Sequence, residues 1–137
     1  ITPTNYILEI GSQGTLTVNS KAASVTPLAA AKTYGDADLA FEGILSGFLE
    51  GDGISATYSR TEGEQAGEVY TIQATLYPIE ALTNYAITYN TAEFIINKRA
   101  ASVTPNEAEK TYGSADPLLT GTLSGFLESD QVVATYS

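Results

Sequence analysis

One stretch of this sequence is written twice. KTYGDADLAFEGILSGFLE begins at Lys32, and KTYGSADPLLTGTLSGFLE begins 78 residues later, at Lys110. The segments Lys21–Ser59 and Arg99–Ser137 are identical at 25 of 39 positions, without a gap. A fixed period of this length is typical of a tandem repeat array. It predicts that residues 20–97 form a complete repeat, that residues 1–19 are the C-terminal part of a preceding repeat, and that residues 98–137 are the N-terminal part of a following repeat.

Within the period, apolar and polar residues alternate as they do in half-buried strands. The clearest example is Glu68–Leu76, where Tyr70, Ile72, Ala74 and Leu76 share one face. About seven such strands fit in one repeat, with turn residues at the spacing of a sandwich. We therefore expect an all-β fold built from small Ig-like β-sandwiches of about 78 residues.

A β-grasp-like fold is the alternative. It needs a helix of about 10–12 residues across its sheet. The only two windows with helical character, Leu28–Ala31 and Glu80–Leu82, are long enough for a single turn each. The sandwich is favoured for this reason.

The charge and the missing residue types exclude several functions. The net charge is −10 and there are only six Lys and Arg residues, so nucleic acid and anionic membranes are not expected partners. No apolar run approaches the length of a membrane helix, so we expect no membrane insertion. The chain has no His and no Cys, which excludes Ser-His-Asp and Cys-His catalysis and Cys-based zinc sites within it. We expect no enzyme.

The boundaries between repeats are short. From Phe94 to Val103 the chain passes from the last strand of one repeat to the first strand of the next without Gly or Pro. A flexible linker would be rich in Gly and Ser, so we expect neighbouring repeats to be stiffly joined partners. The partial copies could also pair between molecules, with residues 1–19 of one chain supplying strands to residues 99–137 of another.

A difference in length between copies marks one further turn. The N-terminal partial copy differs by one residue from the end of the complete repeat, at Gly11–Gly14 in one copy and Asn90-Thr91 in the other. Loops tolerate such a change, whereas a one-residue slip in a strand sends every side chain to the wrong face. The position predicts a hairpin turn.

The complete repeat resembles the MBG domain of the YGX type. The resemblance rests on Lys32–Asp38, Leu45–Phe48, Gly51-Asp52, Ser59-Arg60, Gly63-Glu64, Gly67–Ile72, Asn84-Tyr85 and Phe94–Ile96. Leu39 stands where the family usually has Pro, which the second copy keeps as Pro117. The resemblance implies a tandem module of large secreted or surface proteins of bacteria, many of them adhesin-like. It supplies no catalytic residues.

Acidic residues are the candidates for a metal site. Calcium takes about six to eight oxygen ligands, commonly from one loop. The recurring carboxylates are Asp38, Glu50 and Asp52 in one copy and Asp116, Glu128 and Asp130 in the other. They are spread over two loops in each copy, so a solvated acidic face or turn-capping explains them without a metal. We expect no cofactor, with calcium as the alternative.

Aromatic residues near loops are the candidates for an interaction site or a joint between repeats. They are Tyr34 and Phe48 with their second-copy equivalents Tyr112 and Phe126. Exposed aromatic rings can stack on sugars or anchor a protein partner. The alternative, which we favour, is that Tyr34 tucks into the end of the sandwich with its hydroxyl on a backbone group, while Phe48 fills its loop or seals the joint.

Two further residues are candidates for a special role, either in holding the fold together or in forming a covalent cross-link. Tyr70 occupies the place of a corner tyrosine in Ig-like sandwiches. Lys32 could form an isopeptide bond with Asn84 or Asn90, but nothing in the sequence brings these residues together.

Architecture and missing chemistry together predict a non-catalytic stalk. We expect repeats of a large secreted or cell-surface adhesin-like protein of a bacterium, holding a functional head away from the surface. The alternative is that the repeats themselves bind host glycans or a surface protein. An exposed aromatic cluster repeated along one face would favour the alternative.

Overall fold

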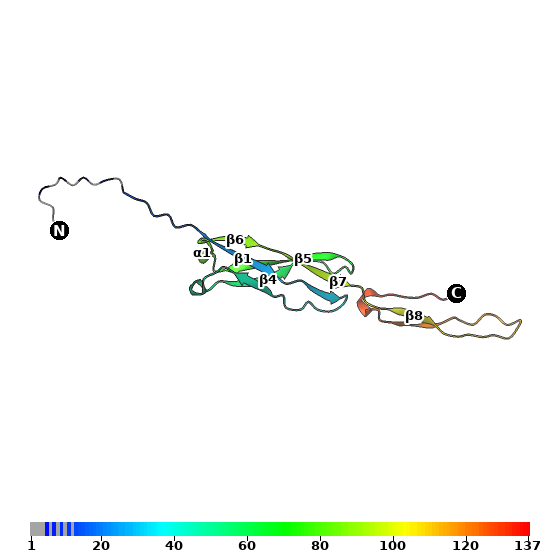
Figure 1. Ribbon diagram of the computed structural model, residues 1–137. Coiled ribbons are helices and arrows are strands. Elements are labelled where there is room, and N and C mark those ends of the chain that lie inside the picture. Colours follow the sequence, from blue (N-terminus) through cyan, green and yellow to red (C-terminus); the bar gives the residue numbers. More distant parts are fainter. Residues whose placement is uncertain (1–4, 6, 8, 10, 12) are drawn as a thin grey trace.

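The computed structural model describes residues 5, 7, 9, 11 and 13–137. Within this part of the chain there are nine strands, one short α-helix and two 3-10 helices. The molecule is elongated, and the strands of its central part lie side by side along the long axis (Figure 1). A complete two-sheet repeat lies in the middle, an extended N-terminal segment leads into it, and a separate C-terminal hairpin follows it.

The first sheet of the complete repeat has three strands in the order β3-β1-β6. Strand β1 (Lys21–Pro27) is central; β3 (Gly43–Ser46) pairs with it antiparallel and β6 (Tyr85–Tyr89) pairs with it parallel. Pro27 ends β1, as expected of a residue that cannot donate to a strand ladder.

The second sheet has four strands in the order β2-β7-β5-β4. They are β2 (Ala30–Thr33), β4 (Ser55–Arg60), β5 (Val69–Tyr77) and β7 (Ala92–Asn97). Strands β2 and β7 are parallel, and the other two pairs are antiparallel. The seven strands of the repeat thus divide into two sheets, which confirms the all-β class; the finer Ig-like topology stays a prediction.

The core follows the predicted alternation. In β5, Ile72 and Leu76 are buried and Tyr70 and Ala74 are half-buried, while the residues between them are exposed. Ile72 joins Phe94 and Ile96 of β7 in the central cluster. Phe41 packs edge-on against Phe94, with ring centroids 5.4 Å apart. One face of β5 and β7 therefore supplies most of the apolar interior.

Helical structure is confined to single turns in the described residues. The α-helix α1 spans Ile79–Leu82, and the 3-10 helices η1 and η2 span Glu50–Asp52 and Glu128–Asp130. None of them has the length that a β-grasp needs, so the β-grasp alternative is not supported. No helix of the described chain is long and apolar enough to cross a membrane.

The prediction of a hairpin turn near Asn90-Thr91 is wrong. Strands β6 and β7 flank this position but belong to different sheets. Asn90 donates its backbone N–H to the Val25 carbonyl and its side-chain amide to Thr26, which holds the end of β6 against β1. The chain then crosses to the second sheet. A length change marks a loop, but it does not tell whether the flanking strands pair. The matching position of the first copy, Gly11–Gly14, lies partly outside the described residues.

The second copy reproduces the local structure of the first but not its burial. Strands β8 (Ser102–Pro105) and β9 (Gly121–Ser124) pair in the same register as β1 and β3. Yet Val103 is 51% exposed, whereas its equivalent Val25 is 0% exposed. The period places the equivalents of β5, β6 and β7 after residue 137. The pairing is local, but the burial needs the later strands.

The N-terminal segment is exposed at the positions that align with β7. Leu16 is 92% exposed, while Phe94, which lies 78 residues later, is 1% exposed. Val18 and Ile96 differ in the same way.

Candidate functional site: the joint between repeats

The joint begins with a tight turn at the end of the complete repeat. The turn, Thr33–Asp36, is closed by a hydrogen bond from the Asp36 N–H to the Thr33 carbonyl, and Gly35 has a φ of 92°. Tyr34 donates its N–H to the carbonyl of Asn97, the last residue of β7. The turn is thereby fixed beside the point where the chain leaves the repeat.

The second half of the joint is a loop of the following copy. Only the four residues from Lys98 to Ala101 separate β7 from β8. The loop from Gly125 to Asp130 folds back on them: Arg99 donates from Nε to the Gly125 carbonyl, 3.1 Å away. A side chain at Gly125 would lie 2.3 Å from the Ala100 carbonyl oxygen, so the loop and the connection are in close contact.

The two halves meet through one polar and one apolar contact. The Tyr34 hydroxyl donates to Oδ1 of Asp130 at 2.8 Å. This bond to a carboxylate raises the pKa of the Tyr34 phenol above its usual value. Beside it, the Leu127 side chain lies directly over Gly35, where a Cβ would be 2.7 Å from a Leu127 methyl. The left-handed φ of Gly35 favours Gly at this position, and the missing side chain leaves room for Leu127 against the turn.

A weaker ion pair lies at the edge of the joint. Arg99 Nη1 is 3.8 Å from Asp36 Oδ1, and both side chains are substantially exposed. A pair of this kind contributes little to stability, but its charges favour the observed orientation.

The equivalent loop of the complete repeat, residues 47–53, is held by contacts with Tyr85 of the same repeat. Phe48 packs on Tyr85, with ring centroids 4.9 Å apart. The Tyr85 hydroxyl accepts the Leu49 N–H at 3.0 Å and donates to Oδ2 of Asp52. The pKa of Tyr85 is raised, first by the bond to Asp52. Phe48 fills its loop, as expected.

The four aromatic candidates thus have different surroundings. Tyr34 lies in the joint, but its hydroxyl bonds to a carboxylate of the next copy and not to a backbone group, so the expected partner is wrong. Phe126 is 43% exposed and lines a hollow at the joint together with Tyr34. Tyr112 is fully exposed. The sequence does not show that Tyr34 reaches Asp130, because that contact depends on how two repeats are placed.

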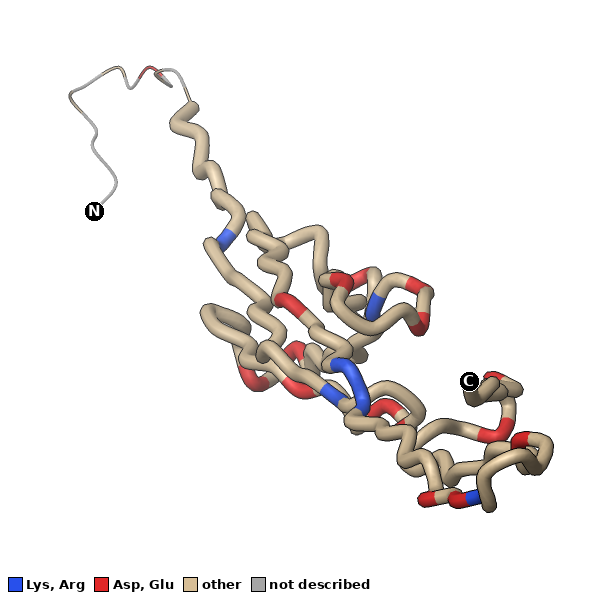
Figure 2. The backbone as a smooth tube through the Cα atoms, turned by 90° about the vertical axis from the view of Figure 1, so that its right-hand side faces the viewer, with Lys and Arg blue, Asp and Glu red and all other residues tan. Residues whose placement is uncertain are grey.

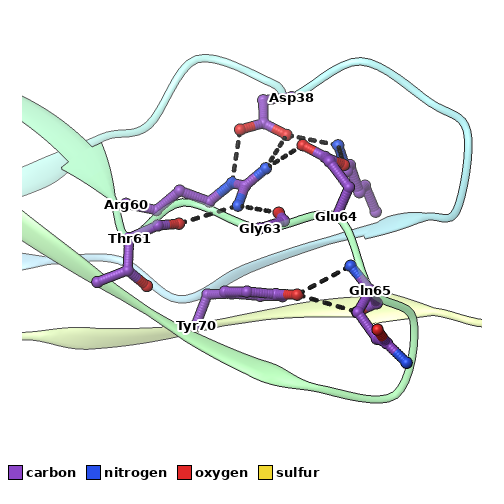
Figure 3. A network of polar contacts seen from close by, with 8 residues as sticks. Asp38, Arg60, Thr61, Gly63, Glu64, Gln65 and Tyr70 are labelled. Atoms are coloured by element: carbon purple, nitrogen blue, oxygen red, sulfur yellow. Dashed lines mark hydrogen bonds and ion pairs between the residues drawn. The ribbon is translucent and has the colours of Figure 1, made fainter.

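A second polar cluster lies inside the complete repeat, on the side of the second sheet (Figure 3). Lys32 is buried, and its Nζ pairs with Asp38 at 2.7 Å and Glu64 at 2.6 Å. Arg60 pairs with the same two carboxylates at 2.7 Å and 2.5 Å. Arg60 also caps the Thr61 and Gly63 carbonyls, at 3.0 Å and 2.7 Å. Two cations and two carboxylates therefore neutralise one another.

Arg60 is the centre of this cluster, and the sequence reading did not single it out. Its guanidinium lies over the ring of Phe94, 4.7 Å from the centroid, and near that of Tyr70 at 5.3 Å. The Tyr70 hydroxyl bonds to the backbone N–H and carbonyl of Gln65, as a corner tyrosine would. The cluster ties the loop after β4 to the core.

The electrostatics of the cluster oppose isopeptide chemistry. The pKa of Asp38 is lowered to about 2, first by the hydrogen bond from Arg60 and then by that from Lys32. The pKa of Lys32 is raised, first by Asp38 and then by Glu64. Attack of Lys32 on an Asn side-chain amide, with ammonia as the leaving group, needs a neutral amine, whereas the two carboxylates stabilise the charged form of Lys32. Of the proposed Asn partners, Asn90 donates to Thr26 instead.

The six calcium candidates do not gather into one site. Asp38 pairs with Lys32 and Arg60, Asp116 pairs with Lys110 at 2.5 Å, and Asp52 and Asp130 each accept a tyrosine hydroxyl. No group of three or more acidic side chains that could hold a metal occurs in the described residues. Acidic residues are instead spread over the complete repeat and the C-terminal hairpin, mostly in loops (Figure 2).

Fold and site together define an all-β tandem-repeat protein whose consecutive copies meet at a short, contacted joint. The family model for the MBG domain (YGX type) matches residues 23–95 and again residues 101–137. The chain belongs to this family. Neither curated proteins nor solved structures gave a match to the chain.

Proposed function

We propose that this chain is a spacer segment of a secreted or cell-surface bacterial protein, in which MBG repeats hold a functional head away from the surface. The observation that carries the proposal is the joint. A connection of four residues, Lys98–Ala101, is supported by the Tyr34–Asp130 hydrogen bond and by Leu127 packed on Gly35. A spacer needs its units held in line, and these contacts do that without a catalytic group.

The acidic surface and the family fit the same role. A net charge of −10 favours solubility and opposes association between neighbouring stalks. Membership of the MBG family supplies a repeat module of the kind found in surface proteins. The role is structural, and the chain performs no reaction of its own.

The test is a distance measurement across the joint. Because the chain has no Cys, the exposed positions Thr75 and Thr122 can be changed to Cys and spin-labelled without background. Pulsed electron resonance should give one narrow distance distribution. A distribution as broad as that of a flexible linker would overturn the proposal. The double variant Tyr34→Phe, Leu127→Ala is the matched comparison and should broaden the distribution.

A binding role for the repeats predicts a different outcome. It would require exposed aromatic rings in a repeated pattern. Tyr112 and Phe126 are exposed in the second copy, but their equivalents Tyr34 and Phe48 are engaged in the joint and in their own loop, so the exposure is not repeated. Binding of this chain to a glycan array or to a surface protein would therefore replace the spacer with an adhesion module.

A further inference from the structure

The chain contains two copies of one loop. The first copy contacts a strand of its own repeat, and the second contacts the preceding repeat. Residues 47–53 and 125–131 have the same shape: a left-handed Gly at the start, a 3-10 turn, and a left-handed residue at the end, Gly53 or Gln131. The closing hydrogen bonds of the two 3-10 turns are also the same. Because the backbones agree, contacts seen at one loop can be transferred to the other.

The first loop shows contacts from its own repeat. Phe48 is covered by Tyr85, and Tyr85 donates to Oδ2 of Asp52. Leu49, however, is 56% exposed. The bond from Tyr85 occupies only one of the two oxygens of Asp52.

The second loop shows contacts from the preceding repeat. Leu127 is half-buried against Gly35, and Oδ1 of Asp130 accepts from Tyr34. Phe126 is 43% exposed, because the period places its equivalent of Tyr85 after residue 137. The phenylalanine is therefore half-buried only in the first loop, and the leucine is half-buried only in the second.

The two sets of contacts are compatible because a carboxylate can accept a hydrogen bond on each of its two oxygens. Tyr85 bonds to one oxygen of Asp52, and Tyr34 bonds to one oxygen of Asp130. The apolar contacts also differ, since the first loop buries its phenylalanine and the second buries its leucine. We infer that the loop Phe48–Gly53 is a receiving surface for the Tyr-Gly turn of another copy of this repeat, so that Asp52 is bridged by two tyrosines from consecutive repeats. This inference rests on the proposed spacer function.

The partner must meet specific chemical requirements. It needs a tyrosine to reach Oδ1 of Asp52 and a glycine after it to admit Leu49, as Gly35 admits Leu127. An acidic residue after the glycine would face Lys21, the equivalent of Arg99, as Asp36 faces Arg99. A preformed turn with the first two features exists at Tyr112-Gly113, closed by a hydrogen bond from the Ser114 N–H to the Thr111 carbonyl.

The test duplicates the complete repeat in place, so that residues 20–97 occur twice in succession ahead of residues 98–137. Spin labels at Thr75→Cys in both copies report on the new joint. The parent should give a narrow distance peak. Tyr34→Phe in the first copy, or Leu49→Ala in the second, should broaden this peak. Combining Tyr34→Phe with Asp52→Asn in the second copy should broaden the distances no further than the more severe single change.

Leu49→Ala also supplies the folding control. Leu49 is exposed in the present chain, so there the substitution should leave the melting temperature unchanged, while it loosens the new joint of the duplicated chain. A new joint that is broad from the outset, or insensitive to both Tyr34→Phe and Leu49→Ala, overturns the inference. If the Tyr34–Asp130 joint of the same molecule is narrow in that case, the spacer function stands; if both joints are broad, both proposals fail.

Discussion

Arg60 has more roles than any other single residue of the complete repeat. It pairs with Asp38 and Glu64, caps two loop carbonyls and lies over the ring of Phe94. A planar guanidinium can make all these contacts at once, whereas a lysine ammonium cannot. Together with the Tyr70 hydroxyl and Lys32, this one side chain attaches the loop after β4 to the core.

Loss of this side chain should destabilise the repeat. We expect Arg60→Ala to lower the free energy of unfolding by about 2 kcal/mol, because Asp38 and Glu64 each lose one of their two cationic partners and the Phe94 ring loses the guanidinium that covers it. Arg60→Lys should recover only part of the loss. Chemical denaturation checks both, with Glu62→Gln in the exposed part of the same loop as a control. Equal stability of Arg60→Ala and the parent would contradict the reading.

Asp38 gives the repeat a dependence on acid pH. Its pKa falls from an ordinary 3.8 to about 2 in the folded chain. The charged form is favoured by folding, so its contribution is complete above the ordinary pKa and is lost as the pH falls toward 2. The free energy of unfolding measured from pH 6 to pH 2 should therefore fall more steeply in the parent than in Asp38→Asn. Parallel curves would show that Asp38 is not the group responsible.

At the scale of elements, the shape of the loop of residues 47–53 depends on the glycines at its two ends. Gly47 has a φ of 83°, and a Cβ there would lie 2.4 Å from the backbone carbonyl oxygen of Ala22. Gly53 has a φ of 60°, but nothing lies within 4 Å of its Cβ position. The second copy places Gln131 at the latter position with a φ of 50°. At Gly47 a side chain would clash with the backbone, whereas at Gly53 only the left-handed backbone conformation disfavours a side chain.

We expect the two positions to respond differently to alanine. Gly47→Ala combines the left-handed backbone with a backbone clash and should cost at least about 2 kcal/mol of unfolding free energy. Gly53→Ala should lower the unfolding free energy by about 1 kcal/mol, because it adds only the strain of a side chain in the left-handed conformation. Thermal unfolding of the two variants side by side checks the difference. A larger loss for Gly53→Ala would reverse this explanation.

Much of the element structure could be predicted from the sequence because it depends on local patterns. The alternation in Glu68–Leu76 predicted the face of β5 that is buried, and the repeat predicted that Val25 and Val103 share a register. The exposure of Val103 could not be read from the same pattern, since burial depends on strands that follow later in the period.

The polar sites were harder to predict because their members are far apart in the sequence. Arg60 meets residues from four separate segments, and the period places its equivalent after residue 137, so comparison of the copies gives it no emphasis. One signal was available: Lys32 and Asp38 recur together as Lys110 and Asp116, and that pair forms again at 2.5 Å. Tyr34 was a joint candidate, but its carboxylate partner emerged only from the placement of two repeats.

At the scale of the whole molecule, the joint should be sensitive to alkaline pH. The pKa of Tyr34 is raised above 10.0, so folding favours the neutral phenol. The hydrogen bond to Asp130 is fully present below pH 10 and is lost as the pH rises through the folded pKa, where two negative charges would face each other. Distances between labels at Thr75→Cys and Thr122→Cys should broaden reversibly above pH 10. Tyr34→Phe should remove most of this change; an unaltered pH profile would contradict the role of Tyr34.

The direction of the strands has a mechanical consequence. Strand β1 enters the repeat and is paired parallel with β6, while β7 leaves it and is paired parallel with β2. Both run along the long axis (Figure 1). Tension applied between neighbouring repeats therefore slides these strands lengthwise past their partners, and the hydrogen bonds of each pair must break together. A stalk of these repeats should resist pulling in shear.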